Sequence, residues 1–187
     1  MFGSTSAWTK CWSGWGREPA PAPAVPDGAL PVITFAEDVT FHLNGDELRA
    51  FHVSNAHTDG DAIVHFRRAN VVHMGDTFFR DRFPFIDTAT GGSIDGLIAA
   101  VGTALALMDA RTMVIPGHGA LSTREDLRAY RDALKSMRDA VAGLMEEGHR
   151  LERIQDLRPI QDQAEAWGQD EAAERNFVAT IHHGLAG

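Results

Sequence analysis

An Asn44–Gly45 pair between two short β-branched and aromatic runs constrains the fold of this chain more than any other feature of its sequence. Both residues readily adopt positive φ, as the central positions of a tight hairpin require. The runs on either side, residues 39–43 and 47–53, are therefore expected to pair as antiparallel strands. A similar run at residues 32–35 predicts one more strand before the hairpin.

Two further runs extend this hairpin into a β-meander. They lie at residues 62–66 and 70–74, and the first follows a polar break at 54–61. A fifth run at 112–115 is short, apolar and stopped by a Pro-Gly pair, which is typical of a brief buried strand. The sequence thus predicts a mostly antiparallel sheet.

Helical patterns occupy most of the second half of the chain. Ser93 precedes apolar residues at helical spacing and is expected to cap a helix that packs flat on the sheet. Ser122 and Glu125 predict a capping box for a long helix that ends near Glu147. The remainder is helical and polar, with a break at Pro159. We therefore expect a fold of the α/β (α+β) class with helices on one face of the sheet.

The first part of the chain differs in composition from the rest. Five of the eight prolines and three tryptophans lie in residues 1–31, among Gly, Ser and Ala. Such a segment favours extended, unpacked backbone, so we expect a disordered leader and linker over 1–31 and one domain over 32–187. A Trp-rich docking segment is the alternative for 1–31.

Composition excludes several classes of protein. The chain of 187 residues has 17 basic and 26 acidic side chains and a formal net charge of -9, which argues against nucleic-acid binding. Its longest apolar stretch, 96–108, is shorter than the roughly 20 residues that cross a bilayer. No signal peptide is recognisable, so we expect no membrane partner and take the cytoplasm as the default location. A single cysteine excludes a disulfide framework and a thiolate zinc cluster.

Three short motifs place metal-binding side chains directly after predicted strands, each next to glycine. They are Ala-His57-Thr-Asp-Gly-Asp, His-Met-Gly-Asp76-Thr and Pro-Gly-His118-Gly. Loops at the strand ends of one sheet bring together side chains that are distant in sequence. Imidazole nitrogens and carboxylate oxygens are the usual zinc ligands when cysteine is absent.

These motifs and their order over residues 31–147 resemble the C-terminal half of a metallo-β-lactamase-fold hydrolase. The resemblance implies a partial αββα sandwich and a dinuclear site, in which His57 binds the first metal, His118 the second, and Asp76 bridges both and is the catalytic carboxylate. It further implies up to two zinc ions, with iron or manganese as alternatives, and hydrolysis of a small-molecule substrate by a metal-bound hydroxide.

The same resemblance bears on the substrate. Family members that cleave β-lactams commonly lack the bridging Asp, whereas thioesterase-like and lactonase-like members have it. Asp76 therefore favours an ester, thioester or lactone as substrate. Lactonases of this fold place a tyrosine where this chain has Phe79, which argues against a lactonase in particular.

One family signature is not found in this sequence. The resemblance implies a His-x-His-x-Asp-His run that supplies the other ligands, and none occurs here. We therefore expect a truncated family member and keep a second hypothesis, a catalytically incompetent half-domain that acts by association with another chain. A homodimer and a complementing chain are the two partners considered.

Several nearby residues have two interpretations. Asp59 and Asp61 either orient His57 or serve as ordinary turn residues, with equal support. Strand alternation puts His73 on the face opposite Asp76, so we expect it not to be a ligand. The phenylalanines at 78, 79, 83 and 85 are expected to form a small core of their loop, with an apolar substrate pocket as the alternative.

Overall fold

The computed structural model describes residues 31–186, which form a single sheet and a layer of helices. The predicted leader and most of the linker, residues 1–30, lie outside the described part. The strands are β1 (Asp38–Leu43), β2 (Asp46–Val53), β3 (Asp61–Phe66), β4 (Val71–His73), β5 (Met113–Ile115) and β6 (Ser122–Thr123). The helices are η2 (Gly75–Thr77), η3 (Thr88–Thr90), α2 (Ile94–Ala106), α3 (Arg124–Glu146), α4 (Leu151–Leu157), α5 (Gln161–Ala166) and α6 (Glu171–Ala186).

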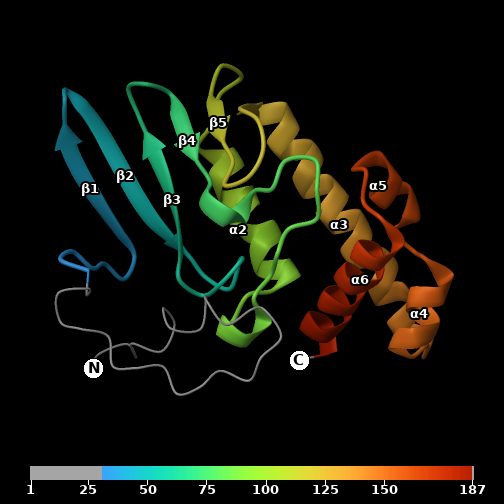
Figure 1. The fold of residues 1–187 in the computed structure, drawn as a ribbon. Helices are drawn as coiled ribbons and strands as arrows, with labels where there is room; N and C mark the ends of the chain where they lie inside the picture. The colour runs from blue at the N-terminus through green and yellow to red at the C-terminus, as the bar shows by residue number, and fades with distance from the viewer. Residues whose placement is uncertain (1–30, 187) are drawn as a thin grey trace.

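The six strands lie in the sheet in the order of the sequence. All neighbours are antiparallel except β4 and β5, which are parallel and connected through α2. Asn44 and Gly45 have φ of 52° and 75° and connect β1 to β2, which confirms the predicted hairpin. The fold is the predicted mixed α/β class, with helices on one side of a mostly antiparallel sheet (Figure 1).

The predicted strand at residues 32–35 is wrong. These residues form bends and irregular backbone, and Val32 and Ile33 are 100% and 58% exposed. A run of β-branched residues becomes a strand only when a neighbour satisfies its backbone groups. The sheet ends at β1, and no strand of the described residues lies beyond it.

Helix α2 begins as predicted. The hydroxyl of Ser93 accepts a hydrogen bond from the Gly96 amide at 3.0 Å, which satisfies one of the free N–H groups of the first turn. The apolar side of the helix, including Leu97 and Val101, is fully buried in the core. Its position as the connection between β4 and β5 places it against the sheet.

Helix α3 begins one residue later than predicted. Thr123 is the N-cap and forms the capping box with Asp126, in place of the predicted Ser122 and Glu125. Ser122 is instead paired with Val114 in β6, and its hydroxyl donates to the Ala120 carbonyl at 3.0 Å. The sequence pattern did not predict β6, so it placed the helix start at the strand residue.

One core joins the sheet to all of the longer helices. Its fully buried residues include Ile63 of β3, Leu127 of α3 and Ile181 of α6. The helices after Pro159 therefore complete the main core rather than form a separate one. No helix of residues 31–186 is both long and apolar enough to cross a membrane.

Candidate metal centre

His57 lies in the loop that follows β2, and its ring is held from one side. The residue is 7% exposed, and its Nδ1–H donates to the carbonyl of Phe85 at 2.8 Å. A carbonyl only accepts, so this bond assigns the proton of the neutral ring to Nδ1 and leaves the lone pair of Nε2 free. Nε2 lies 3.6 Å from Oδ2 of Asp76.

Asp76 follows β4 through a left-handed glycine. Gly75 has φ of 53°, which turns the chain sharply after Met74 and starts the short helix η2. The Thr77 hydroxyl then donates to the Met74 carbonyl at 2.7 Å and fixes the turn. A Cβ on Gly117 would overlap Oδ1 of Asp76, so the close approach of these two loops requires glycine.

His118 follows β5 and completes the group. Its Nε2 lies 3.4 Å from Oδ1 of Asp76. The ring stacks on Phe79 with centroids 4.7 Å apart and an interplanar angle of 21°. The His118 carbonyl accepts from the Arg80 amide at 2.9 Å, so side chain and backbone are both held by the loop after Asp76.

The structure thus brings the three predicted ligands together at one edge of the sheet. The two carboxylate oxygens of Asp76 face different imidazoles, at distances close to the roughly 3.4 Å between two ligands of one tetrahedral zinc ion. The two imidazoles and the carboxylate have the chemical type and the orientation that would let Asp76 bridge two metal ions. His57 is also oriented through its second nitrogen in the way that metal-binding histidines usually are.

The number of donors falls short of a complete site. Each metal position would have one imidazole and one oxygen of Asp76, whereas catalytic zinc normally has three protein ligands. Within residues 31–186, no group of three or more His, Cys, Asp or Glu side chains is arranged to hold a metal ion. The described residues therefore fit part of a metal centre rather than a whole one.

The structure resolves the role of the neighbouring polar residues. The carboxylate of Asp61 accepts from the amide of Thr58 at 2.8 Å, and that of Asp59 accepts from the amide of Asn55 at 3.3 Å. Burial raises the pKa of Asp61 above its usual range. Both carboxylates thus act within the turn, and His57 is oriented by the Phe85 carbonyl instead. Sequence patterns carry no signal for a backbone acceptor 28 residues away.

His73 has a local backbone partner. Its Nδ1 accepts from the amide of Gly75 at 3.1 Å, which supports the turn that leads to Asp76. This agrees with the expectation that the residue has a structural role.

The loop phenylalanines divide into two pairs. The ring centroid of Phe78 lies 4.9 Å from that of Tyr130, and the ring of Phe83 stacks on Phe177 with centroids 4.7 Å apart. Both rings therefore belong to the core. Phe79 and Phe85 instead flank the metal-binding group, the first on His118 and the second 5.6 Å from the ring of His57. Phe85 is 55% exposed. Phe78 and Phe83 therefore pack in the main core rather than in a separate small core of their loop, and the apolar substrate pocket stays a prediction.

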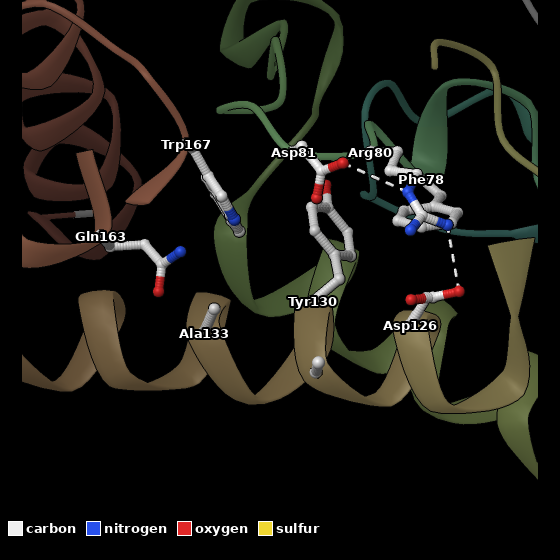
Figure 2. Close-up of a pocket in the computed structure, with 9 residues that line it drawn as sticks. Phe78, Arg80, Asp81, Asp126, Tyr130, Ala133, Gln163 and Trp167 are labelled. Atoms are coloured by element: carbon white, nitrogen blue, oxygen red, sulfur yellow. Dashed lines mark hydrogen bonds and ion pairs between the residues drawn. The ribbon is translucent and has the colours of Figure 1, made fainter. Parts of the chain in front are cut away.

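A cavity of about 200 Å³ lies next to this group but does not contain it (Figure 2). Arg80 projects into the cavity and pairs with Asp81 at 3.2 Å and with Asp126 at 3.0 Å. Tyr130 lines it too, and burial raises the pKa of its hydroxyl. Because Asp81 and Asp126 neutralise the charge of Arg80, we interpret these ion pairs as supports for the loop that holds His118.

Comparison with known proteins identifies the family. The sequence model of the metallo-beta-lactamase superfamily matches residues 4–145. No curated protein sequence is significantly similar to the chain. Among solved structures, a double mutant of the sec-alkyl sulfatase PisA1 superposes with a TM-score of 0.62 and 15% identity over 84% of this chain. The stereoselective inverting sec-alkylsulfatase Pisa1 from Pseudomonas sp. superposes with a TM-score of 0.56 and 13% identity over 82% of this chain.

A metallo-beta-lactamase from Pontibacter korlensis also matches, with a TM-score of 0.49 and 21% identity over 56% of this chain. The chain spans 49% of that protein and 27% of each sulfatase. At these identities, the two sulfatases establish a shared fold only. The family match covers most of the sequence, and the chain therefore belongs to the metallo-beta-lactamase superfamily.

Proposed function

We propose that the chain is a metal-dependent hydrolase, with His57, Asp76 and His118 as its metal ligands. One observation carries the proposal: the carboxylate of Asp76 presents a different oxygen to each imidazole, at 3.6 and 3.4 Å. Zinc is the default metal for these donors, and iron and manganese are the alternatives.

Each of these residues has a defined part in the proposed site. The Phe85 carbonyl keeps the Nε2 lone pair of His57 directed at Asp76, and the ring of Phe79 limits the rotation of His118. A divalent ion held by these residues would supply Lewis-acid activation of the scissile carbonyl and of water. Asp76 neutralises positive charge at the centre of the site.

The proposed substrate is a small ester, thioester or lactone. Resemblance to family members with a bridging Asp supports this class, and Phe79 supports an ester or thioester over a lactone. The ring of Phe85, which is 55% exposed and lies 5.6 Å from the ring of His57, offers an apolar wall to the part of a substrate next to the scissile bond.

A second candidate function rests on the incomplete donor set. In the described residues, each metal position has only one imidazole beside the shared carboxylate. A half-domain that acts by association with another chain would have this arrangement, because the second chain would supply the other donors. In this candidate, the isolated chain is not a catalyst.

Metal content separates the two candidates. Zinc, iron and manganese are measured by elemental analysis on chain purified without chelators, with protein concentration from absorbance. A stoichiometry near two per chain supports the hydrolase and contradicts the half-domain. A chain that binds no metal even after dialysis against zinc contradicts independent catalysis.

Replacement of one proposed ligand tests the assignment. His118→Ala removes the imidazole that faces Oδ1 of Asp76, so we expect it to abolish hydrolysis of ester and thioester substrates and to lower bound metal. His183→Ala is the matched control, because His183 is an exposed histidine in α6. Wild-type activity in His118→Ala would reject the assignment.

A further inference from the structure

A second hollow, which we call the groove, lies between the loop of residues 83–86 and helix α6. It has a volume of about 270 Å³. Its other lining residues are Gln169 and, from α6, Ala173, Asn176, Phe177 and Thr180. The ring of Phe83 stacks on that of Phe177 with centroids 4.7 Å apart, and Ile86 is 5% exposed. The groove therefore has a packed apolar floor.

No ionisable side chain lines the groove, although the chain has a net charge of -9. The charged residues in this part of α6 pair instead with the end of α4. Glu174 pairs with Arg158, and Arg175 pairs with Asp156. A charged ligand would find no ion-pair partner in the groove, whereas burial of an apolar ligand is favourable there.

Two polar side chains of the groove already have partners. The hydroxyl of Thr180 donates to the carbonyl of Asn176 at 3.1 Å, and the side-chain amide of Gln169 donates to the carbonyl of Trp167 at 3.0 Å. An apolar ligand can contact both side chains without breaking these hydrogen bonds. Its binding therefore avoids the cost of leaving these donors unpaired.

Phe85 connects the groove to the proposed metal centre. Its carbonyl accepts from Nδ1 of His57 at 2.8 Å, and its ring centroid lies 5.6 Å from that of the His57 ring. The same phenylalanine lines the groove. A substrate whose scissile carbonyl lies beside His57 can therefore extend its chain past Phe85 into the groove.

The dimensions of the groove suit one narrow chain. Its volume is below the roughly 300 Å³ at which pockets for drug-sized ligands begin. Along α6 it extends from Ala173 to Thr180, which is about 10 Å at the helical rise per residue. An extended alkyl chain advances about 1.25 Å per carbon with ordinary C–C bonds and angles, so the groove holds at most about eight carbons.

We propose that the groove binds an unbranched, uncharged aliphatic chain of up to about eight carbons, which makes a medium-chain ester or thioester the substrate. The inference rests on the proposed function for its reaction. The groove itself contains none of the three proposed metal ligands. Chain binding and hydrolysis can therefore be measured separately on the same protein.

Binding of linear 2-alkanones, from 2-butanone to 2-dodecanone, tests the groove without hydrolysis. These ketones are uncharged and have no ester bond. Their affinity for the full chain is measured by isothermal titration calorimetry. Complete burial of a methylene raises affinity about fourfold, and in a groove open on one side we expect about twofold. The increase should stop once the alkyl chain has about eight carbons.

Substitutions in α6 locate the bound chain. Ala173→Phe fills the groove and should weaken binding of 2-decanone by roughly tenfold or more. Ala172→Phe is the matched control, because Ala172 is exposed and does not line the groove. Asn176→Asp adds a charge with little change in shape and should also weaken binding, whereas Asn176→Ala should bind like the wild type. If Ala173→Phe does not fold, as judged by circular dichroism, Asn176→Asp decides.

Three results would overturn the proposal. One is a ketone affinity that does not depend on chain length. Another is wild-type affinity for 2-decanone in both Ala173→Phe and Asn176→Asp, because the ketone would then bind another surface. The third is a wild-type dimer that binds no ketone and that Ala173→Phe dissociates, because a second copy of the chain would then occupy the groove.

Hydrolysis of p-nitrophenyl esters, from acetate to dodecanoate, is recorded on the same samples with added zinc. Ketone binding in the groove without hydrolysis supports the groove and contradicts independent catalysis. Hydrolysis without ketone binding in the groove supports the proposed function and rejects the groove alone.

Discussion

At the scale of single residues, the candidate centre depends on two glycines and one backbone carbonyl, none of which is a proposed metal ligand. Gly75 supplies the left-handed turn before Asp76, and Gly117 lets the loop of His118 approach the carboxylate. The carbonyl of Phe85 selects the tautomer of His57. The three proposed ligands are thus positioned by neighbours that a search for His and Asp would pass over.

Gly117→Ala should disrupt this arrangement. The new Cβ would overlap the Asp76 carboxylate and lie 2.5 Å from the Gly75 carbonyl oxygen, so one of the two loops must move. We expect a loss of about 2 kcal/mol in the free energy of unfolding, as for other overpacked sites, together with lower metal content. Urea denaturation and elemental analysis measure the two effects.

Gly102→Ala is the matched control. Gly102 lies inside α2 with no atom within 4 Å of a new Cβ, so alanine should stabilise the chain by up to about 1 kcal/mol. Equal effects of the two substitutions would show that contact with Asp76 does not matter.

At the scale of elements, α3 connects the sheet to the C-terminal helices and starts at a reciprocal cap. Thr123 and Asp126 bond each other through side chain and backbone, and Asp126 also pairs with Arg80. Arg80 belongs to the loop that holds His118. The start of α3 and the candidate centre are therefore linked through one arginine.

Asp126→Ala should destabilise the chain in a pH-dependent way. Hydrogen bonds from Thr123, and then the charge of Arg80, hold the pKa of Asp126 below its usual value. A lowered folded-state pKa stabilises the native state above the normal value near 4, and this contribution is lost as pH falls through the folded-state pKa. We expect a loss of about 1 kcal/mol at pH 7 from the cap and a smaller loss at pH 3.

Urea denaturation at both pH values measures this difference. Asp132→Ala is the control, because Asp132 lies on the same helix, is mostly exposed and pairs only with its neighbour Arg131. It should change stability by less than about 0.5 kcal/mol at either pH. A loss for Asp126→Ala that does not depend on pH would contradict the assigned role of its charge.

At the scale of the whole molecule, helices bury one face of the sheet, and within residues 31–186 nothing covers the other, apolar face. The C-terminal helices contribute to the first face through a shared core, in which Phe177 of α6 stacks on Phe83. Phe83 lies two residues before Phe85, whose carbonyl orients His57. Packing of the last helix is thus coupled to the loop beside the candidate centre.

Phe177→Ala should lower the stability of the entire chain. Phe177 is 4% exposed, and loss of a buried ring costs about 3 kcal/mol or more. For a protein of this size, that corresponds to a fall in Tm of about 6–12 °C. Calorimetry should show one transition at the lower temperature, and Thr180→Ala on the same helix should shift it by little. Two separate transitions would mean that the C-terminal helices form an independent unit.

Local patterns were sufficient for much of the fold. The Asn44–Gly45 hairpin, the cap at Ser93 and the end of the long helix near Glu147 depend on neighbours within one or two turns of the chain, and each is found as predicted. The predicted strand at 32–35 is wrong because these residues have no neighbouring strand to pair with. The predicted cap at Ser122 is wrong because Ser122 pairs with Val114 as part of β6. Pairing of distant segments is not encoded in local spacing.

The same distinction between local pattern and tertiary contact applies to the candidate centre. The sequence by itself determined the identities of His57, Asp76 and His118, because the motifs around them follow strands and carry the family resemblance. Only the tertiary structure decided that one carboxylate faces both imidazoles, that a backbone carbonyl orients His57, and that one sheet face is open. These facts depend on strand order, loop contact and helix placement, which arise only when segments distant in sequence pack together.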